Sequence, residues 1–244
     1  MTGMDSAGVR WWAPDRTVWW VATLFMVGSA CFVLGAVPAY ADLVGVHADG
    51  LTFFVGSVFF TSAAGLQQLL ATGAVPSRGY HPRAAVQWRA LRLSPHRAEW
   101  WAGTVQFAGT LWFNLSTFHA LQSSLTAGQA DQQVWRPDAF GSIAFLVASC
   151  LAYADVRRPW ITWRPRDLGW SIATLNMVGS IAFGISAVAS YVLSDDTLRD
   201  AQRANAGTFL GALCFLVGAA LLIPDQAGSA PDDVTSAAVP PPAG

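Results

Sequence analysis

Six long apolar runs constrain this chain of 244 residues more than any other feature. A run of about 20 apolar residues forms a helix long enough to cross the ~30 Å hydrocarbon core of a bilayer. No charged side chain lies near the middle of any run, and 12% of all residues are charged, against about 25% in a typical soluble domain. The sequence therefore predicts an all-α, polytopic membrane bundle of six transmembrane helices, over residues 17–40, 51–73, 99–121, 138–155, 169–193 and 206–223.

The composition and the motifs exclude several functional classes. A net charge of −1 offers no basic excess for binding nucleic acid, and three cysteines are too few for a disulfide scaffold. No Ser-His-Asp order, glycine-rich phosphate loop or pair of carboxylates appears, so we expect no enzyme, no catalytic residue and no cofactor. His47 lies near Asp42 and Asp49, but no spacing typical of metal ligands supports a metal site there, and we expect none.

The arginines predict the orientation in the membrane. Lysine is absent, and eleven of the fourteen arginines fall on one side of the six runs, which we expect to be the cytoplasm. Residues 1–16 are then a cytoplasmic N-terminal segment, residues 17–223 form the membrane domain, and the proline-rich residues 224–244 form a disordered cytoplasmic tail. The expected location is the inner (plasma) membrane of a bacterium, because the arginine-rich, lysine-free composition suggests a GC-rich bacterial genome.

A signal peptide is the alternative interpretation of the first run. Ala39-Tyr40-Ala41 has the A-x-A pattern of a cleavage site. The apolar run before it is longer than the roughly 7–15 residues of a signal-peptide core, so a retained helix is favoured.

One motif occurs in every run: a glycine, a small residue, two variable residues and a phenylalanine. Another small residue follows seven positions after each glycine, so all three share one helical face. Because lipid solvates large apolar side chains well, membrane helices associate where small residues let their backbones approach. We therefore expect a helix-packing role for Gly28, Gly56, Gly109, Gly141, Gly179 and Gly211, and for Phe32, Phe60, Phe113, Phe145, Phe183 and Phe215.

The runs also group in pairs. The first, third and fifth runs open with a tryptophan nine residues before the glycine, and the even runs do not. The repeating unit is therefore predicted to be a two-helix hairpin, used three times in one orientation, over residues 17–73, 99–155 and 169–223. Ala187, away from the motif face, is expected to face lipid.

The hairpin with its G-S-x-x-F core resembles the YrhK-like family of bacterial integral membrane proteins. The resemblance is strongest over residues 53–64, 140–149 and 208–219, and it does not extend to the loops or the tail. It implies a small helical membrane protein built from hairpins, and it implies no chemistry.

Amide side chains within the runs form the candidate polar site. Gln106 and Asn176 each lie three residues before the motif glycine, and Asn114 is a further amide in the third run. Buried amides either join helices by hydrogen bonds or line a path for a solute.

The functional prediction is a non-enzymatic scaffold or accessory protein whose bundle binds lipid or a partner. The alternative is a transporter or channel for a small neutral or weakly polar solute. A protein partner and a homo-oligomer both stay open. The expected partners are membrane lipids, whose anionic headgroups would contact two arginine-rich cytoplasmic loops, with Arg78, Arg83, Arg89, Arg92 and Arg97 in one and Arg157, Arg158, Arg164 and Arg166 in the other.

Overall fold

The computed structural model describes residues 11–79, 81, 86–88, 91–122, 125–156, 166–191, 193 and 199–228, with side chains for all of these except 155, 156 and 225–228. Regular structure in this part is helical, apart from one isolated bridge between Arg16 and Arg78. The long helices are α1 (Thr17–Gly35), α3 (Val46–Ala71), α4 (Ala98–His119), α6 (Arg136–Val156), α7 (Leu168–Ala189) and α8 (Ala201–Gly228). The short elements are α2 (Pro38–Val44), α5 (Ala127–Ala130) and the π-helical turn η2 (Asp131–Trp135).

The helix boundaries differ from the predicted ones near prolines. The first helix ends at Gly35 rather than at residue 40, because Pro38 opens the separate helix α2. A proline is accepted in the first turn of a helix, here α2, where its missing N–H would have no partner in any case. Helix α3 begins at Val46, five residues before the predicted start.

Two helices, α6 and α8, are longer than the predicted runs 138–155 and 206–223. The helical chain before α6 begins at Ala127 and passes through the π-helical turn, where Arg136 pairs with Asp131 at 2.9 Å. Helix α8 runs from Ala201 to Gly228 with Pro224 inside its last turns. The predicted start of a disordered tail at residue 224 is therefore wrong, and residues 229–244 lie outside the described residues.

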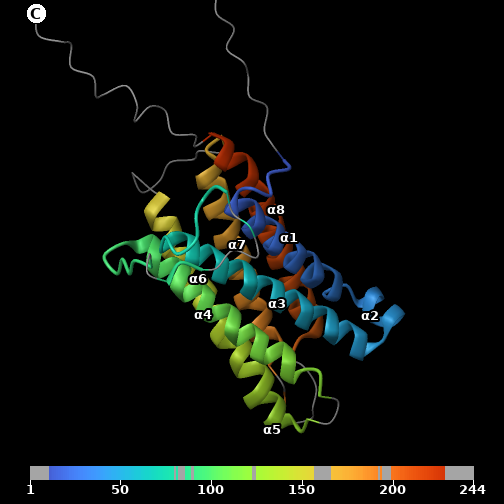
Figure 1. Ribbon diagram of the computed structural model, residues 1–244. Helices are drawn as coiled ribbons and strands as arrows, with labels where there is room; N and C mark the ends of the chain where they lie inside the picture. The colour runs from blue at the N-terminus through green and yellow to red at the C-terminus, as the bar shows by residue number, and fades with distance from the viewer. Residues whose placement is uncertain are drawn as a thin grey trace, which may run out of the picture.

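The long helices form a closed ring (Figure 1). Each helix packs against its neighbours in chain order, and α8 returns to pack against α1. Successive helices in the ring run antiparallel, so α1, α4 and α7 begin at one end, while α2 and α5 lie at the other. The ring order is thus α1, α3, α4, α6, α7 and α8.

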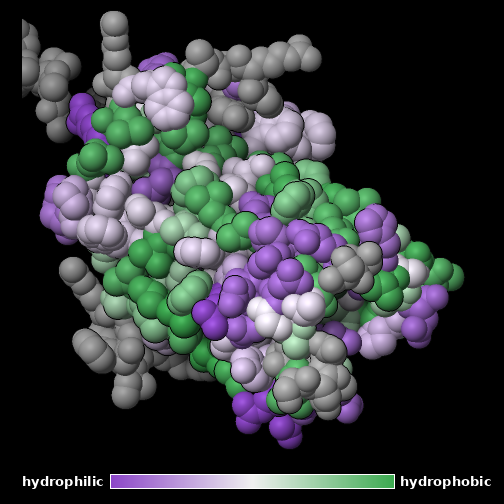
Figure 2. All heavy atoms as spheres, turned by 90° about the horizontal axis from the view of Figure 1, so that it is seen from below, coloured by the Kyte–Doolittle hydropathy of each residue, from purple (hydrophilic) through white to green (hydrophobic). Residues whose placement is uncertain are grey.

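The outer surface of the ring is apolar. Val58 on α3, Leu111 on α4 and Ile185 on α7 are each more than 40% exposed. Figure 2, which looks at the end carrying α2 and α5, shows hydrophilic side chains gathered over this end and hydrophobic ones around them. Such an apolar belt would be unfavourable in water. Together with five helices that are long and apolar enough to cross a bilayer, it indicates a membrane-embedded protein.

Small residues and phenylalanine rings fill the inside of the ring. Ala187, expected to face lipid, is only 3% exposed, because it lies on the inner side of α7, where its carbonyl accepts a hydrogen bond from Trp135. The central rings are packed mainly edge to face, with centroids 5.2 to 6.3 Å apart, the favoured distance for aromatic pairs. These rings belong to Phe32, Phe60, Phe113, Phe145, Phe183 and Phe215, all at most 7% exposed.

Candidate functional site

The six motif glycines lie at three helix crossings. A Cβ added to Gly28 would stand 2.9 Å from the carbonyl oxygen of Gly56, and one added to Gly56 would stand 3.1 Å from that of Gly28. Gly179 and Gly211 face each other in the same way, at 3.1 and 3.0 Å. A Cβ on Gly141 would stand 3.2 Å from the carbonyl of Gly109. Backbone therefore meets backbone within each of the pairs α1–α3, α4–α6 and α7–α8.

Asn114 belongs to the contact between α3 and α4. Its Oδ1 accepts a hydrogen bond of 2.7 Å from Ser57, and its amide donates to Thr61. The Ser57 hydroxyl is also 2.9 Å from that of Thr117. This amide is satisfied by protein groups, so it joins helices and does not line a cavity.

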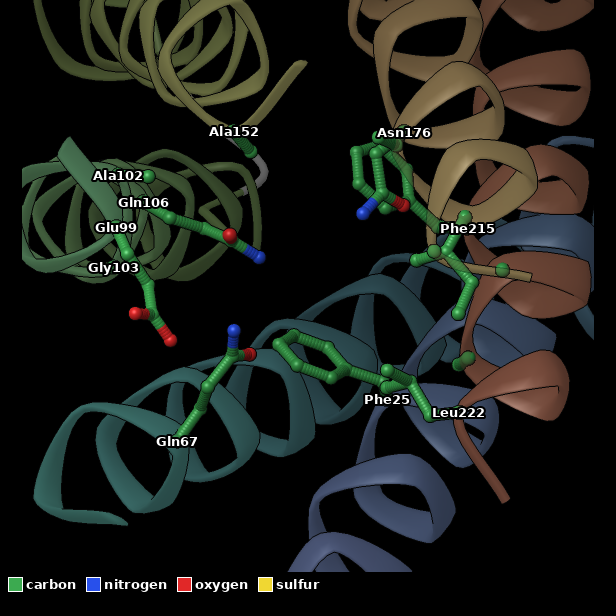
Figure 3. A pocket seen from close by; sticks show the side chains of 15 residues that line it. Phe25, Gln67, Glu99, Ala102, Gly103, Gln106, Ala152, Asn176, Phe215 and Leu222 are labelled. Carbon is green, nitrogen blue, oxygen red and sulfur yellow. The ribbon is translucent and has the colours of Figure 1, made fainter. Parts of the chain in front are cut away.

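Gln106 and Asn176 line a central cavity of about 310 Å³, shown in Figure 3. All the long helices contribute to its wall, and it reaches the first turns of α4 and α7. Its volume falls at the lower end of the range for small-molecule sites. The wall consists of Phe25, Gln67, Glu99, Ala102, Gly103, Gln106, Ala152, Gly169, Ile172, Ala173, Asn176, Phe215, Gly218, Ala219 and Leu222.

Three amides carry the polar character of this cavity. The side chains of Gln67, Gln106 and Asn176 come from α3, α4 and α7 and point into the same space. None of the three side chains forms a hydrogen bond to another described residue. Gly218 makes room for one of them, because a Cβ there would stand 3.1 Å from Asn176 Oδ1. The cavity thus holds amide donors and acceptors that the described protein groups leave unused.

The mouth of the cavity carries an ion pair. Glu99, in the first turn of α4, bonds to the Arg97 guanidinium, and both side chains are 58% exposed. The exposure makes this pair weak, in the range below about 1 kcal/mol. Arg97 balances the charge of Glu99, the only carboxylate among the wall residues, so the pair adds no net charge to the mouth.

Aromatic rings close the floor. Phe25 and Phe215 line the cavity and both contact Phe60, with centroids 5.5 and 6.0 Å away. Beyond them the packed phenylalanine rings surround a void of only about 10 Å³, too small for a solute. The cavity is therefore open toward one end of the bundle and blocked toward the other by the described side chains.

Sequence analysis identified Gln106 and Asn176 as candidate lining residues, and it did not place Gln67 with them. Phe25, Gln106 and Asn176 each lie three residues before a motif glycine, and Gln67, Ala152 and Leu222 each lie eleven after one. The register of the motif was therefore the signal that could have placed Gln67 beside the other two.

Other predicted features fall elsewhere. Within the described part of the chain, no three His, Cys, Asp or Glu side chains come together as metal ligands. Of the two arginine-rich loops, the described members Arg78, Arg92, Arg97 and Arg166 are exposed. Five further members lie outside the described residues: Arg83, Arg89, Arg157, Arg158 and Arg164.

No protein-family model, no curated protein and no solved structure matches the chain.

Proposed function

We propose that the protein is a six-span membrane bundle built from three hairpins in one orientation. Recurring hydrogen bonds support this proposal. Thr23, Thr104 and Thr174, each five residues before a motif glycine, donate at 2.8 Å to the carbonyl of the tryptophan four residues earlier in the chain. The glycine crossings recur in the same register.

Helix α4 is the sixth proposed span. It is less apolar than the five helices that meet the usual criterion, because it carries Thr104, Gln106 and Asn114. These polar groups are half-buried in the bundle, whereas Leu111, Trp112 and Leu115 on α4 are 40–49% exposed. A helix that turns its polar face to other helices and its apolar face outward is suited to a bilayer.

Reporter fusions test this topology. Six spans with the arginine-rich loops in the cytoplasm place Ala127 outside and Ala237 inside. Fusions of alkaline phosphatase and of green fluorescent protein at these two residues should report opposite sides. The same side at both residues would mean that the span count is wrong. A third fusion at His96, before α4, tests α4 itself, because His96 and Ala127 would report the same side if α4 did not cross the membrane.

For the activity, we propose non-enzymatic binding of a small neutral ligand, or a neutral group of a membrane partner, in the central cavity. The observation that carries this is the convergence of three amides without a described partner. Amides offer both donors and acceptors, which suits a neutral ligand with both kinds of group. Phe25, Phe215 and Leu222 would contact its apolar part. The arginine-rich loops would hold anionic headgroups around the mouth.

Transport of a small neutral solute is the second candidate. The cavity reaches about the level where the aromatic rings begin, and a solute would need those rings to separate. This candidate therefore requires a conformational change, whereas binding requires none.

The double variant Gln106→Leu/Asn176→Leu distinguishes the two. We expect it to keep or gain thermal stability in detergent, since neither amide bonds to a described group, while any neutral molecule that co-purifies is lost. Ala108→Leu, on the exposed face of α4, is the control. Glycerol or urea uptake into liposomes that exceeds protein-free liposomes and is abolished by the double variant would favour transport. Co-purification unaffected by the double variant would reject the cavity as the site.

A further inference from the structure

A second depression lies at the other end of the bundle, on its outer surface. It has a volume of about 430 Å³ and follows α7, with α6 on one side and the start of α8 beside it. We call it the α7 groove. Its wall consists of Leu146, Ile181, Gly184, Ile185, Val188, Ala189, Arg199, Asp200 and Arg203.

The α7 groove is apolar along its length and charged at one end. Ile181, Ile185 and Val188 are 48–58% exposed, and a Cβ added to Gly184 would meet nothing within 4 Å. From Ile181 to Ala189 the groove extends about 12 Å along the helix, close to the thickness of one hydrocarbon leaflet. Its shape therefore admits an extended acyl chain.

The charged end is held in place by the backbone. The backbone N–H of Arg199 donates to the carbonyl of Tyr191 at 2.8 Å, and that of Asp200 donates to the carbonyl of Ala189 at 2.9 Å. Asp200 then pairs with Arg203 at 3.2 Å. Arg199 forms no ion pair with a described residue, so the three charged residues of the wall, Arg199, Asp200 and Arg203, together carry one positive charge in excess.

Aromatic side chains mark the same level as an interface. The rings of Trp135 and Tyr191 lie 4.9 Å apart at this end of α6 and α7, and tryptophan and tyrosine gather where headgroups meet hydrocarbon. Only three arginines fall on this side in the sequence, and two of them line the groove. A general bias toward positive charge cannot explain them, because that bias favours the opposite side.

We infer that the α7 groove binds one anionic phospholipid from the leaflet at this end. The phosphate contacts Arg199 and Arg203, and one acyl chain lies along Ile181, Ile185 and Val188 over Gly184. The charge excess matches a phosphodiester with a neutral headgroup, such as phosphatidylglycerol. This site depends on the membrane location and not on the function of the central cavity.

Native mass spectrometry of the full-length protein in detergent tests the inference, with dioleoyl phosphatidylglycerol and dioleoyl phosphatidylcholine as probes. We expect Arg199→Gln to weaken binding of phosphatidylglycerol about fivefold and to leave phosphatidylcholine unchanged. Gly184→Leu should weaken both lipids, because its side chain fills the path of the acyl chain. Arg136→Gln, which removes an arginine outside the groove, is the control.

Two results would overturn the inference. One is equal binding of the two lipids by the unmodified protein. The other is an equal affinity for phosphatidylglycerol in Arg199→Gln and in Arg136→Gln, since the cytoplasmic arginines would then account for all binding. If Arg199→Gln fails to fold, Gly184→Leu decides alone, and unchanged binding of both lipids would reject the groove.

Discussion

The contacts inside the helix pairs and the contacts between them are built differently. Inside α1–α3, α4–α6 and α7–α8, glycine meets glycine and a phenylalanine ring closes each crossing. Between the pairs, the contact of α3 with α4 uses the amide of Asn114, and that of α6 with α7 uses a 2.8 Å bond between Ser149 and Ser180. No side-chain hydrogen bond joins described residues of α8 and α1. Inside the α7–α8 pair, Ser186 also bonds to Thr208 at 2.8 Å, so polar bonds are not confined to the contacts between pairs. The ring closes at α8–α1 without a side-chain hydrogen bond among the described residues.

The largest expected effect is at a glycine crossing. Gly28→Leu should destabilise the bundle by about 3 kcal/mol, because the new side chain would overlap the Gly56 carbonyl and the Phe60 ring. Ala30→Leu, two residues away on the exposed face of α1, should cost far less. Thermal unfolding in detergent measures both. Similar melting temperatures for the two variants would show that the crossing tolerates bulk and would remove the basis of the comparison.

A smaller effect is expected at the polar contact between α3 and α4. Asn114→Leu should cost about 1–2 kcal/mol, because the hydroxyls of Ser57 and Thr61 lose the amide between them. Gln106→Leu, on the same helix, should cost less than about 0.5 kcal/mol, since its amide bonds to no described group. Chemical denaturation in mixed micelles gives both values. A larger loss for Gln106→Leu would mean that the two amides have been assigned the wrong roles.

The smallest effects on stability are expected at Ser180, which is hydrogen-bonded, and at Ser29, which has no hydrogen bond to a described residue. Ser180→Ala should cost about 0.6 kcal/mol, the average for a hydrogen bond between membrane helices. Ser29, at the matching position of α1, is fully buried and its hydroxyl has no hydrogen-bond partner among the described residues. Ser29→Ala should therefore be neutral or slightly stabilising. The order of the two melting temperatures decides the matter, and a reversed order would contradict the proposed difference between the contacts.

Residues whose place depends on helical period alone could be predicted from the sequence. The motif glycines and phenylalanines follow from a spacing of four and seven along each helix, and they lie at crossings and in the central cluster. The different surroundings of the Asn114 and Asn176 side chains could not be predicted in this way. One amide meets hydroxyls of α3 and the other faces a cavity, and this depends on which helix stands beside each face. Ala187 was misplaced for the same reason.

The ends of two helices also differ from the ends of the apolar runs, because capping groups and prolines affect where a helix begins and ends. The run that forms α6 was predicted to begin at residue 138, where apolar residues become frequent. The helical chain begins earlier, at Ala127, and its first turns are rich in polar residues. A capping box formed by Thr126 and Gln129 begins that extension. The tail was predicted to begin at Pro224, yet one missing backbone bond near the end of a helix as long as α8 is not enough to end it.

The contact between α8 and α1 means that the ring has no first helix. The start of α1 and the end of α8 lie at the same end of the bundle, so the two ends of the described core are neighbours (Figure 1). A circularly permuted chain, with these ends joined by a flexible linker and the chain reopened between α3 and α4, would keep every neighbour in the ring. The order of the helices along the chain is then one of several that would give the same ring of neighbours.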